Sequence, residues 1–280
     1  MVTGALNLTD SHVHLQSSEL RPFLDEVLTR AAQSGVRYFV CNGTSERDWP
    51  DVDRLAAEHP QIVPFFGVHP WYLSPRSANW LHVLELRVKE TKSGVGEIGL
   101  DRYREPVNEG EQEEVFRAQL ALARKLHVPV SVHCLRAWNW LLEVLKSEPP
   151  LPCGLLIHAF GGSCEVIKPL LDLGAYLSFA GNTLSANRLR AHEAFRRVPL
   201  DRVLIETDAP DLLPPPEFRS HKLAPEAKRE INSPANLGAI AAGLAALRGL
   251  PLDNFCAIIW ENSKRFFGPL IAEKEKPQTA

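Results

Sequence analysis

Two histidines separated by one residue, His12 and His14, are the first feature of this sequence that points to chemistry. They end a short apolar run near the N-terminus. Because side chains two positions apart on a strand point to the same face, both imidazoles can project into one site. Neutral imidazole is the commonest metal ligand among protein side chains. The pair therefore indicates a metal site at the end of a first strand.

Other ionisable residues occupy the same position, at or near the ends of later apolar runs: Glu97, His133, His158 and Asp208. Taken singly, such residues are more commonly core or capping groups, which is how we interpret His82, His127, His192 and His221. Taken together, they would be very costly to bury without a compensating partner. A metal cation is the simplest partner, and imidazole and carboxylate ligands suit zinc, manganese, iron or magnesium.

The number of candidate ligands indicates two ions. Six exceed what one tetrahedral ion with an open position needs, but suffice for two divalent ions (Mg²⁺, Mn²⁺ or Zn²⁺) about 3.5–4 Å apart, bridged by a carboxylate and a hydroxide. We expect Glu97 to be the bridge, because its strand lies between the other ligands around a barrel. The remaining ligands would divide between the ions as His12, His14 and Asp208 for one, and His133 and His158 for the other.

This site would perform metal-assisted hydrolysis. A hydroxide bridging the ions, with its pKa drawn toward ~7, would be the nucleophile. Asp208 can reach both metal and hydroxide, so we expect it to transfer the proton, with Glu97 as the second catalytic carboxylate. Glu206 shares the inward parity of Asp208 one layer deeper and is expected to support the ligands from behind. His69, in Gly-Val-His-Pro, and Arg136 are expected beside the metals or the substrate.

The elements that position these residues alternate along the chain. Short runs rich in Val, Ile, Leu and Phe are each followed by a helical pattern, and they begin near residues 5, 36, 62, 94, 129, 154, 175 and 202. Buried parallel strands have this composition. Eight strand–helix units in about 250 residues predict an α/β fold, a single (β/α)₈ TIM barrel. A doubly wound open sheet is the alternative. We expect the barrel domain to span residues 1–270, followed by a polar tail at 271–280.

The composition is that of an ordinary globular enzyme, with 45% hydrophobic and 23% charged residues. The formal net charge of −3 gives no global attraction to nucleic acid. Five widely spaced cysteines without a Cys-x-x-Cys argue against a disulfide framework or a thiolate zinc site. With neither a signal peptide nor an apolar stretch of membrane-spanning length in view, we expect an intracellular protein, cytoplasmic and also nuclear, without a membrane partner.

From Thr9 to Gly268 the sequence resembles the TatD family of metal-dependent deoxyribonucleases. Seven stretches in the family's order carry the resemblance: Thr-Asp-Ser-His-Val-His-Leu (9–15), Phe-Gly-Val-His-Pro (66–70), Val-Gly-Glu-Ile-Gly-Leu-Asp (95–101), Phe-Arg-Ala-Gln-Leu-Ala-Leu-Ala (116–123), Pro-Val-Ser-Val-His (129–133), His-Ala-Phe-Gly-Gly (158–162) and Val-Leu-Ile-Glu-Thr-Asp-Ala-Pro (203–210). The family's metal ligands fall on the six residues chosen above from strand position.

The resemblance implies a divalent-metal phosphodiesterase that acts on DNA, with 3′-exonuclease character in many members. Two departures adjoin the substrate rather than the metals. Many members carry Arg two residues after the strand-five histidine, where this chain has Leu135 followed by Arg136. The family's His-Cys-Phe-Ser-Gly is here His158-Ala-Phe-Gly-Gly.

Three functions remain open from the residues. Phosphodiester hydrolysis on DNA is favoured, with local positive charge from loop residues Arg102, Arg104, Arg136, Arg219, Lys222, Lys228 and Arg229. Their alternative interpretation is a solvated loop surface. The second function is hydrolysis of an amide, lactone or small phosphoester in the same barrel. The third is a protein-interaction scaffold, which the intact ligand set disfavours.

Overall fold

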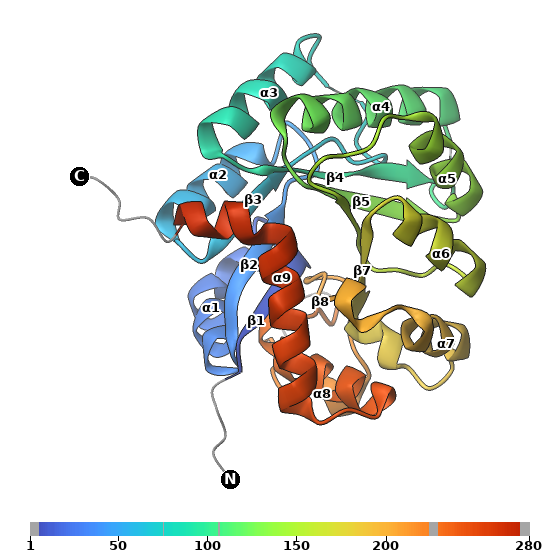
Figure 1. Cartoon of the computed structure of the whole chain (residues 1–280). Coiled ribbons are helices and arrows are strands. Elements are labelled where there is room, and N and C mark those ends of the chain that lie inside the picture. Colours follow the sequence, from blue (N-terminus) through green and yellow to red (C-terminus); the bar gives the residue numbers. More distant parts are fainter. Residues whose placement is uncertain (1–5, 75, 106, 224–228, 275–280) are drawn as a thin grey trace.

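Eight parallel strands pair in chain order, β1 to β8, and each is followed by helical structure on the outside of the ring (Figure 1). The computed structural model describes residues 6–74, 76–105, 107–223 and 229–274. A doubly wound sheet would have a non-sequential strand order, so the predicted (β/α)₈ barrel is confirmed.

The strands are β1 (Leu8–Val13), β2 (Val36–Asn42), β3 (Ile62–Phe66), β4 (Gly94–Asp101), β5 (Val130–Leu135), β6 (Leu155–Ile157), β7 (Ala175–Ala180) and β8 (Val203–Glu206). The helices are α1 (Leu24–Gln33), α2 (Trp49–Glu58), α3 (Trp80–Thr91), α4 (Glu109–Leu126), α5 (Trp138–Ser147), α6 (Cys164–Asp172), α7 (Leu189–Arg197), α8 (Leu237–Arg248) and α9 (Leu252–Lys274). Short 3₁₀ turns lie between them, at Arg21–Phe23, Gly181–Leu184, Leu200–Arg202, Pro216–Phe218 and Pro234–Asn236.

The barrel closes where β8 returns to β1. The backbone N–H of Asp208 donates to the carbonyl of His12 (3.0 Å), and the N–H of His14 donates to the carbonyl of Ala209 (2.9 Å). The Ser11 hydroxyl donates to the Ile205 carbonyl at 2.8 Å. These bonds join residues nearly 200 positions apart, and they place the histidines at the end of β1 next to the carboxylate that follows β8.

Helix α4 shows ordinary capping chemistry at both of its ends. The side chain of Asn108 accepts a hydrogen bond from the N–H of Glu111 at the start of α4. The same helix ends at Leu126 and is capped by His127, which has a left-handed backbone with φ of 54°. His127 is therefore a capping residue, as the sequence indicated, and has no part in the barrel interior.

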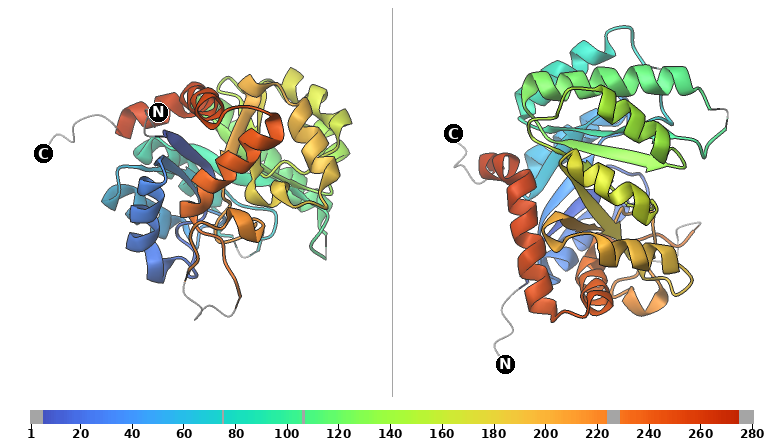
Figure 2. Two further views of the ribbon diagram at one scale, coloured as in Figure 1. Left: turned by 90° about the horizontal axis from the view of Figure 1, so that it is seen from below. Right: turned by 45° about the vertical axis from the view of Figure 1, so that its right-hand side comes forward.

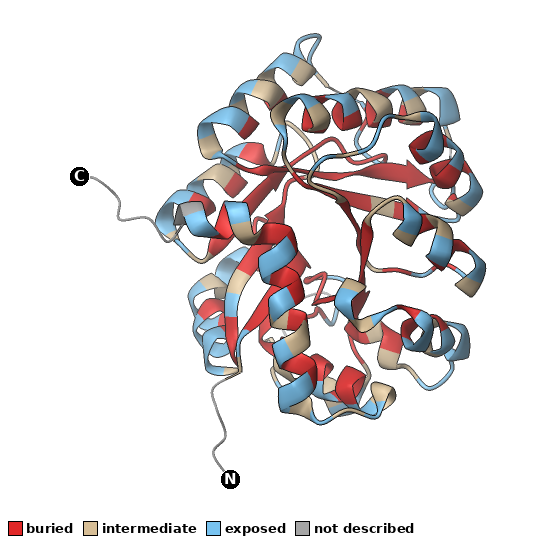
Figure 3. Ribbon diagram, in the orientation of Figure 1, coloured by how far each residue is buried: buried red, intermediate tan, exposed pale blue. Residues whose placement is uncertain are grey.

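Two helices follow β8 and complete the fold. Helix α9 crosses the barrel at the end opposite the site and contacts β1, β3 and β8 (Figures 1 and 2). Burial follows this arrangement, since the strands are almost entirely buried while the outer helices alternate buried and exposed residues (Figure 3). No single helix in the described parts of the chain is long and apolar enough to span a membrane. Two consecutive helical segments, Pro234–Arg248 and Leu252–Ala272, together have the length and composition of a span, but they are bent sharply relative to each other.

Two of the differences from the predicted element boundaries concern α9 and β4. Helix α9 runs to Lys274, into the expected tail, because Leu270 and Ile271 are buried against the barrel. The last six tail residues lie outside the described part of the chain. Strand β4 spans Gly94–Asp101, so Glu97 lies in the middle of its strand rather than near the end. The strand continues past Glu97 because the side chains of Ile98 and Leu100 are buried in the core.

Candidate metal centre

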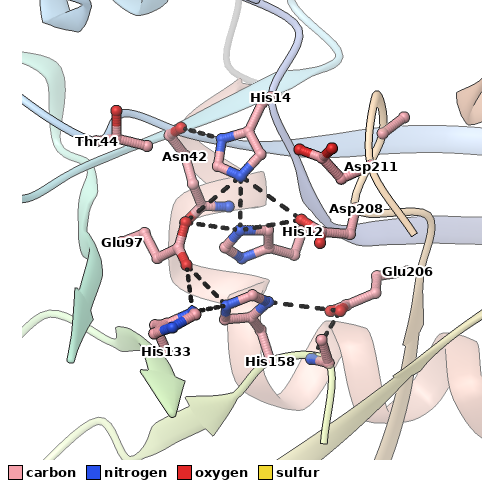
Figure 4. Close-up of polar contacts among 12 residues, drawn as sticks. His12, His14, Asn42, Thr44, Glu97, His133, His158, Glu206, Asp208 and Asp211 are labelled. Atoms are coloured by element: carbon pink, nitrogen blue, oxygen red, sulfur yellow. Dashed lines mark hydrogen bonds and ion pairs between the residues drawn. The ribbon is translucent and has the colours of Figure 1, made fainter. Parts of the chain in front are cut away.

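Glu97 lies at the centre of the barrel mouth, and its two carboxylate oxygens face different histidines (Figure 4). Oε2 is 3.3 Å from Nε2 of His12 and 3.4 Å from Nε2 of His14. Oε1 is 2.8 Å from Nε2 of His158 and 3.1 Å from Nδ1 of His133. A carboxylate with a histidine pair on each oxygen has the geometry expected of a bridge between two cations.

Asp208 completes the β1 side of this cluster. Its Oδ1 lies 3.5 Å from Nε2 of His14 and 3.8 Å from Nε2 of His12. The backbone of Asp208 has φ of 51°, an uncommon conformation for a residue other than glycine. Ala159 and Arg136, just beyond β6 and β5, share this left-handed backbone. Such conformations concentrate at functional sites.

Neighbouring groups hold the ligand rings in place. Nδ1 of His14 lies 2.9 Å from the Asn42 carbonyl and Nδ1 of His12 lies 3.1 Å from the Ser131 hydroxyl. Each ring therefore presents Nε2 to the centre. Glu206 lies one layer deeper, 3.6 Å from Nδ1 of His158, and accepts hydrogen bonds from the Ala159 N–H and the Ser178 hydroxyl.

Asp101 is a residue of this site that the sequence analysis did not select. Its Oδ2 lies 2.8 Å from Nε2 of His133, which leaves Nδ1 of that ring directed at Glu97. A carboxylate behind a metal-binding histidine commonly fixes the ring in this way. The signal was available, because Asp101 follows Glu97 by four positions on the same strand. The sequence analysis also did not select Asp10, which lies two positions before His12 on the same face of β1. Burial raises the pKa of the Asp10 carboxyl to about 8.

His69 lies closer to the centre than a purely substrate-facing residue would. Its Nε2 is 3.3 Å from Oε1 of Glu97, and its Nδ1 accepts a hydrogen bond from the N–H of Trp71 at 3.0 Å. Because an accepting Nδ1 carries no proton, the neutral ring bears its proton on Nε2 and donates toward Glu97. Arg136, by contrast, is exposed, with its guanidinium 4.7 Å from the ring centroid of Tyr103.

The electrostatics of the cluster reflect burial and crowding. Burial would raise the pKa of Glu97, yet the surrounding histidines His69, His158 and His12 hold it well below its usual range. Burial alone would lower the pKa of His14, but its hydrogen bond to Asp208 and the charge of Glu97 raise it to about 9. Burial lowers the pKa of His69 to about 4, so this ring is neutral. The centre thus gathers several ionisable groups in a buried space, where charges are costly unless a partner compensates them.

The donor set fits divalent cations. Three groups of ligand atoms lie within 4.8 Å of one another: His12, His14 and Glu97; His12, His158 and Asp208; and His69, Glu97 and His133. Ring nitrogens also face each other directly, at 3.3 Å for His12 and His14 and at 3.4 Å for His133 and His158. Cations between these facing nitrogens would accept their lone pairs, and nitrogen and oxygen donors suit zinc, manganese or magnesium.

A closed (β/α)₈ barrel with such a cluster at its mouth defines a metal-dependent hydrolase, and the comparisons with known proteins agree. The family described as TatD related DNase matches residues 9–268. A relative named "Uncharacterized metal-dependent hydrolase YabD", from Bacillus subtilis, is 32% identical over 93% of this chain and 98% of its own length. One named "3'-5' ssDNA/RNA exonuclease TatD", from Klebsiella pneumoniae, is 35% identical over 86% of this chain and 90% of its own.

A solved structure gives the same result. The TatD homologue YJJV from Escherichia coli superposes with a TM-score of 0.85 at 26% identity, covering 95% of this chain and 99% of that one. The chain therefore belongs to the TatD family of metal-dependent hydrolases, enzymes that hydrolyse ester bonds.

Proposed function

We propose that this protein is a divalent-metal-dependent deoxyribonuclease that removes nucleotides from the 3′ end of single-stranded DNA. The observation that carries the proposal is the two-sided arrangement around Glu97, which presents one carboxylate oxygen to each of two histidine pairs. Two cations held this way stabilise both the attacking and the leaving oxygen of a phosphodiester. The similarity to relatives named for 3′–5′ exonuclease action on single strands supports this substrate.

The proposed ligands divide between the two sides of Glu97. His12, His14 and Asp208 would hold one ion and His133 and His158 the other, with Glu97 shared. When bound, these ions would supply positive charge to the reacting phosphate and make water more acidic. Asp101 keeps Nδ1 of His133 free for its ion, since it occupies the opposite ring nitrogen.

Asp208 is the proposed proton carrier. Its carboxylate contacts the β1 histidines His12 and His14, and its side chain is 12% exposed. The hydrogen bond to His14 and nearby His12 and His158 hold its pKa below the usual range against the opposing effect of burial. It is therefore ionised at neutral pH and able to take a proton from the attacking water. Neutral His69 is proposed to donate from Nε2, steadying Glu97 or a phosphate oxygen.

The direct test is release of label from 3′-labelled single-stranded DNA in the presence of magnesium or manganese, with a chelator control and a 5′-labelled substrate to establish direction. We expect stepwise release from the 3′ end that the chelator abolishes. Parallel reactions with single-stranded RNA, a lactone and a small phosphoester test the substrate class. Hydrolysis of a lactone or small phosphoester without any DNA turnover would overturn the proposal.

The two-ion arrangement has its own test in Glu97→Gln. A neutral amide links two cations poorly, so metal per chain, measured by elemental analysis, should fall from two toward one. Glu109→Gln, on the exposed start of α4, is the matched control and should leave the metal content unchanged. Two metals retained in Glu97→Gln would remove the bridging assignment.

A further inference from the structure

Aromatic and arginine side chains line one side of the barrel mouth, beyond the ends of β3, β4 and β5. We call this group the rim and define it as Trp71, Tyr103, Arg104 and Arg136. All four are exposed, with exposed fractions of 38% for Trp71 and 56% for Tyr103. Large exposed aromatic rings cost solvation free energy without adding to the core, so a cluster of them beside an active site indicates a binding surface.

The rim arginines differ from the other cations around the mouth. Arg102, Arg219 and Arg229 each form an ion pair with a nearby glutamate: Glu109, Glu230 and Glu19. Within the described ranges, no carboxylate forms an ion pair with Arg104 or Arg136. Their guanidinium groups instead lie over aromatic rings, Arg104 at 5.4 Å from the centroid of Trp71 and Arg136 at 4.7 Å from that of Tyr103. Their charge is not cancelled by these partners.

The rim is tied to the metal centre by short contacts. The ring of Trp71 lies edge-on to His69 at 5.1 Å and to His133 at 6.0 Å between centroids. Asp101 binds both regions: Oδ2 contacts His133, while Oδ1 accepts hydrogen bonds from the backbone N–H groups of Tyr103 (2.5 Å) and Arg104 (3.1 Å). One carboxylate therefore fixes the part of the rim that follows β4, Tyr103 and Arg104, relative to a proposed ligand.

We infer that the rim is a subsite for single-stranded nucleic acid, in which Trp71 and Tyr103 stack on nucleobases and Arg104 and Arg136 pair with the flanking phosphates. This inference rests on the proposed function. Every base has a π-face that can stack on an aromatic ring without regard to sequence. In a duplex the base faces are covered by their neighbours, so the rim binds single strands in preference to double strands. The two rim arginines supply local positive charge for binding phosphates in a chain whose net charge is −3.

The test compares Tyr103→Ala with Tyr103→Phe in the metal-loaded protein. Binding is measured by fluorescence anisotropy of a labelled phosphorothioate oligo(dT), which resists hydrolysis, and turnover with ordinary oligo(dT). Tyr103→Ala should weaken binding and raise KM about tenfold or more, the loss expected for one base–aromatic stack, with a smaller change in kcat. Tyr103→Phe keeps the ring and should remain near wild type. Leu86→Ala, exposed on α3, is the control for loss of a surface apolar group.

A substrate whose last three nucleotides lack bases separates stacking from structural damage. Tyr103→Ala should turn over this abasic substrate as fast as the wild type does, because neither has a base to stack. Equal losses of turnover on both substrates, or unchanged binding of oligo(dT), would overturn the assignment of the rim as a nucleic-acid subsite. Binding that depends on the rim, without hydrolysis of any nucleic acid, would support the rim subsite and overturn the proposed nuclease function. Hydrolysis of DNA that does not depend on the rim would support the nuclease function and overturn the rim subsite.

Discussion

The two ends of the barrel interior have opposite chemistry. At the mouth, buried imidazoles and carboxylates surround Glu97. At the other end, apolar side chains of α9 close the barrel by packing against interior residues of the strands. The cluster consists of the strand residues Val40, Val63, Phe65, Leu156, Tyr176 and Leu204 and the α9 residues Phe266, Phe267, Leu270 and Ile271. We call this cluster the plug.

The change from one end to the other occurs over two residues, within a strand or at its C-terminal end. Each of four plug residues is followed two positions later by a polar interior group, giving the pairs Val40 and Asn42, Leu156 and His158, Tyr176 and Ser178, and Leu204 and Glu206. Since residues i and i+2 share a face, both members of a pair point into the barrel at successive layers. The apolar layer supplies stability, and the polar layer above it carries groups that are costly to bury and useful for chemistry.

The largest expected effect is on stability, at the plug. Phe267 is fully buried and edge-on to Phe65. Phe267→Ala should lower the free energy of unfolding by about 3–5 kcal/mol, through lost transfer energy and a cavity, while leaving turnover per folded molecule unchanged. Urea unfolding followed by circular dichroism measures it. Leu189→Ala, at a side chain that is 72% exposed, should change stability by no more than about 0.5 kcal/mol. Equal losses in the two variants would contradict the division of roles.

The next largest effect is expected on turnover, from a substitution at the barrel mouth. Asp208→Asn keeps the shape of the side chain but loses its charge and basicity, so kcat for DNA hydrolysis should fall at least ~10²-fold, with at least one metal still bound. The control is Asp211→Asn in the same loop, where the native carboxylate is exposed and paired with Arg229. Near-normal turnover in Asp208→Asn would remove this residue as the proton carrier.

A smaller effect is expected behind the ligands. Asp101→Asn should weaken metal affinity by about 10–100-fold, because His133 loses the charged partner that orients its ring. Titration with a competing chelator gives the affinity, and Asp172→Asn on the surface of α6 is the control. Unchanged affinity would assign Asp101 to the rim alone, where it binds the backbone of Tyr103 and Arg104.

The smallest effect is on pH dependence. In the metal-free protein the pKa of His14 is raised to about 9, above its ordinary value of 6.5. Its contribution to stability is therefore fully present below pH 6.5 and is lost as pH rises through 9. Metal binding requires the neutral ring, so below pH 9 this residue lowers metal affinity by up to about tenfold per pH unit. Calorimetry in buffers of different ionisation enthalpy should show proton release on metal binding at pH 7.5. Absence of proton release would contradict the ligand role of His14.

The strand pattern and the residues at strand ends could be predicted from the sequence. Periodicity of two places His12 and His14 on one face, and eight apolar runs separated by helical patterns specify the barrel. Residues at the ends of parallel strands must then meet at one edge, which is why the six proposed ligands converge without any further information. The same parity rule reaches Glu206, and applied once more along β1 and β4 it reaches Asp10 and Asp101.

Only the tertiary structure decided how these groups face one another. Which oxygen of Glu97 faces which histidine depends on side chains from β1, β5 and β6, whose relative positions are fixed by barrel closure rather than by local preference. The rim depends on loop conformations after three different strands, of which the one after β4 is held by the carboxylate of Asp101. The path of α9 depends on the shape of the opening that its aromatic residues fill. A linear pattern records the face to which a side chain belongs, but distances between residues far apart in the chain arise only when packing brings their strands together.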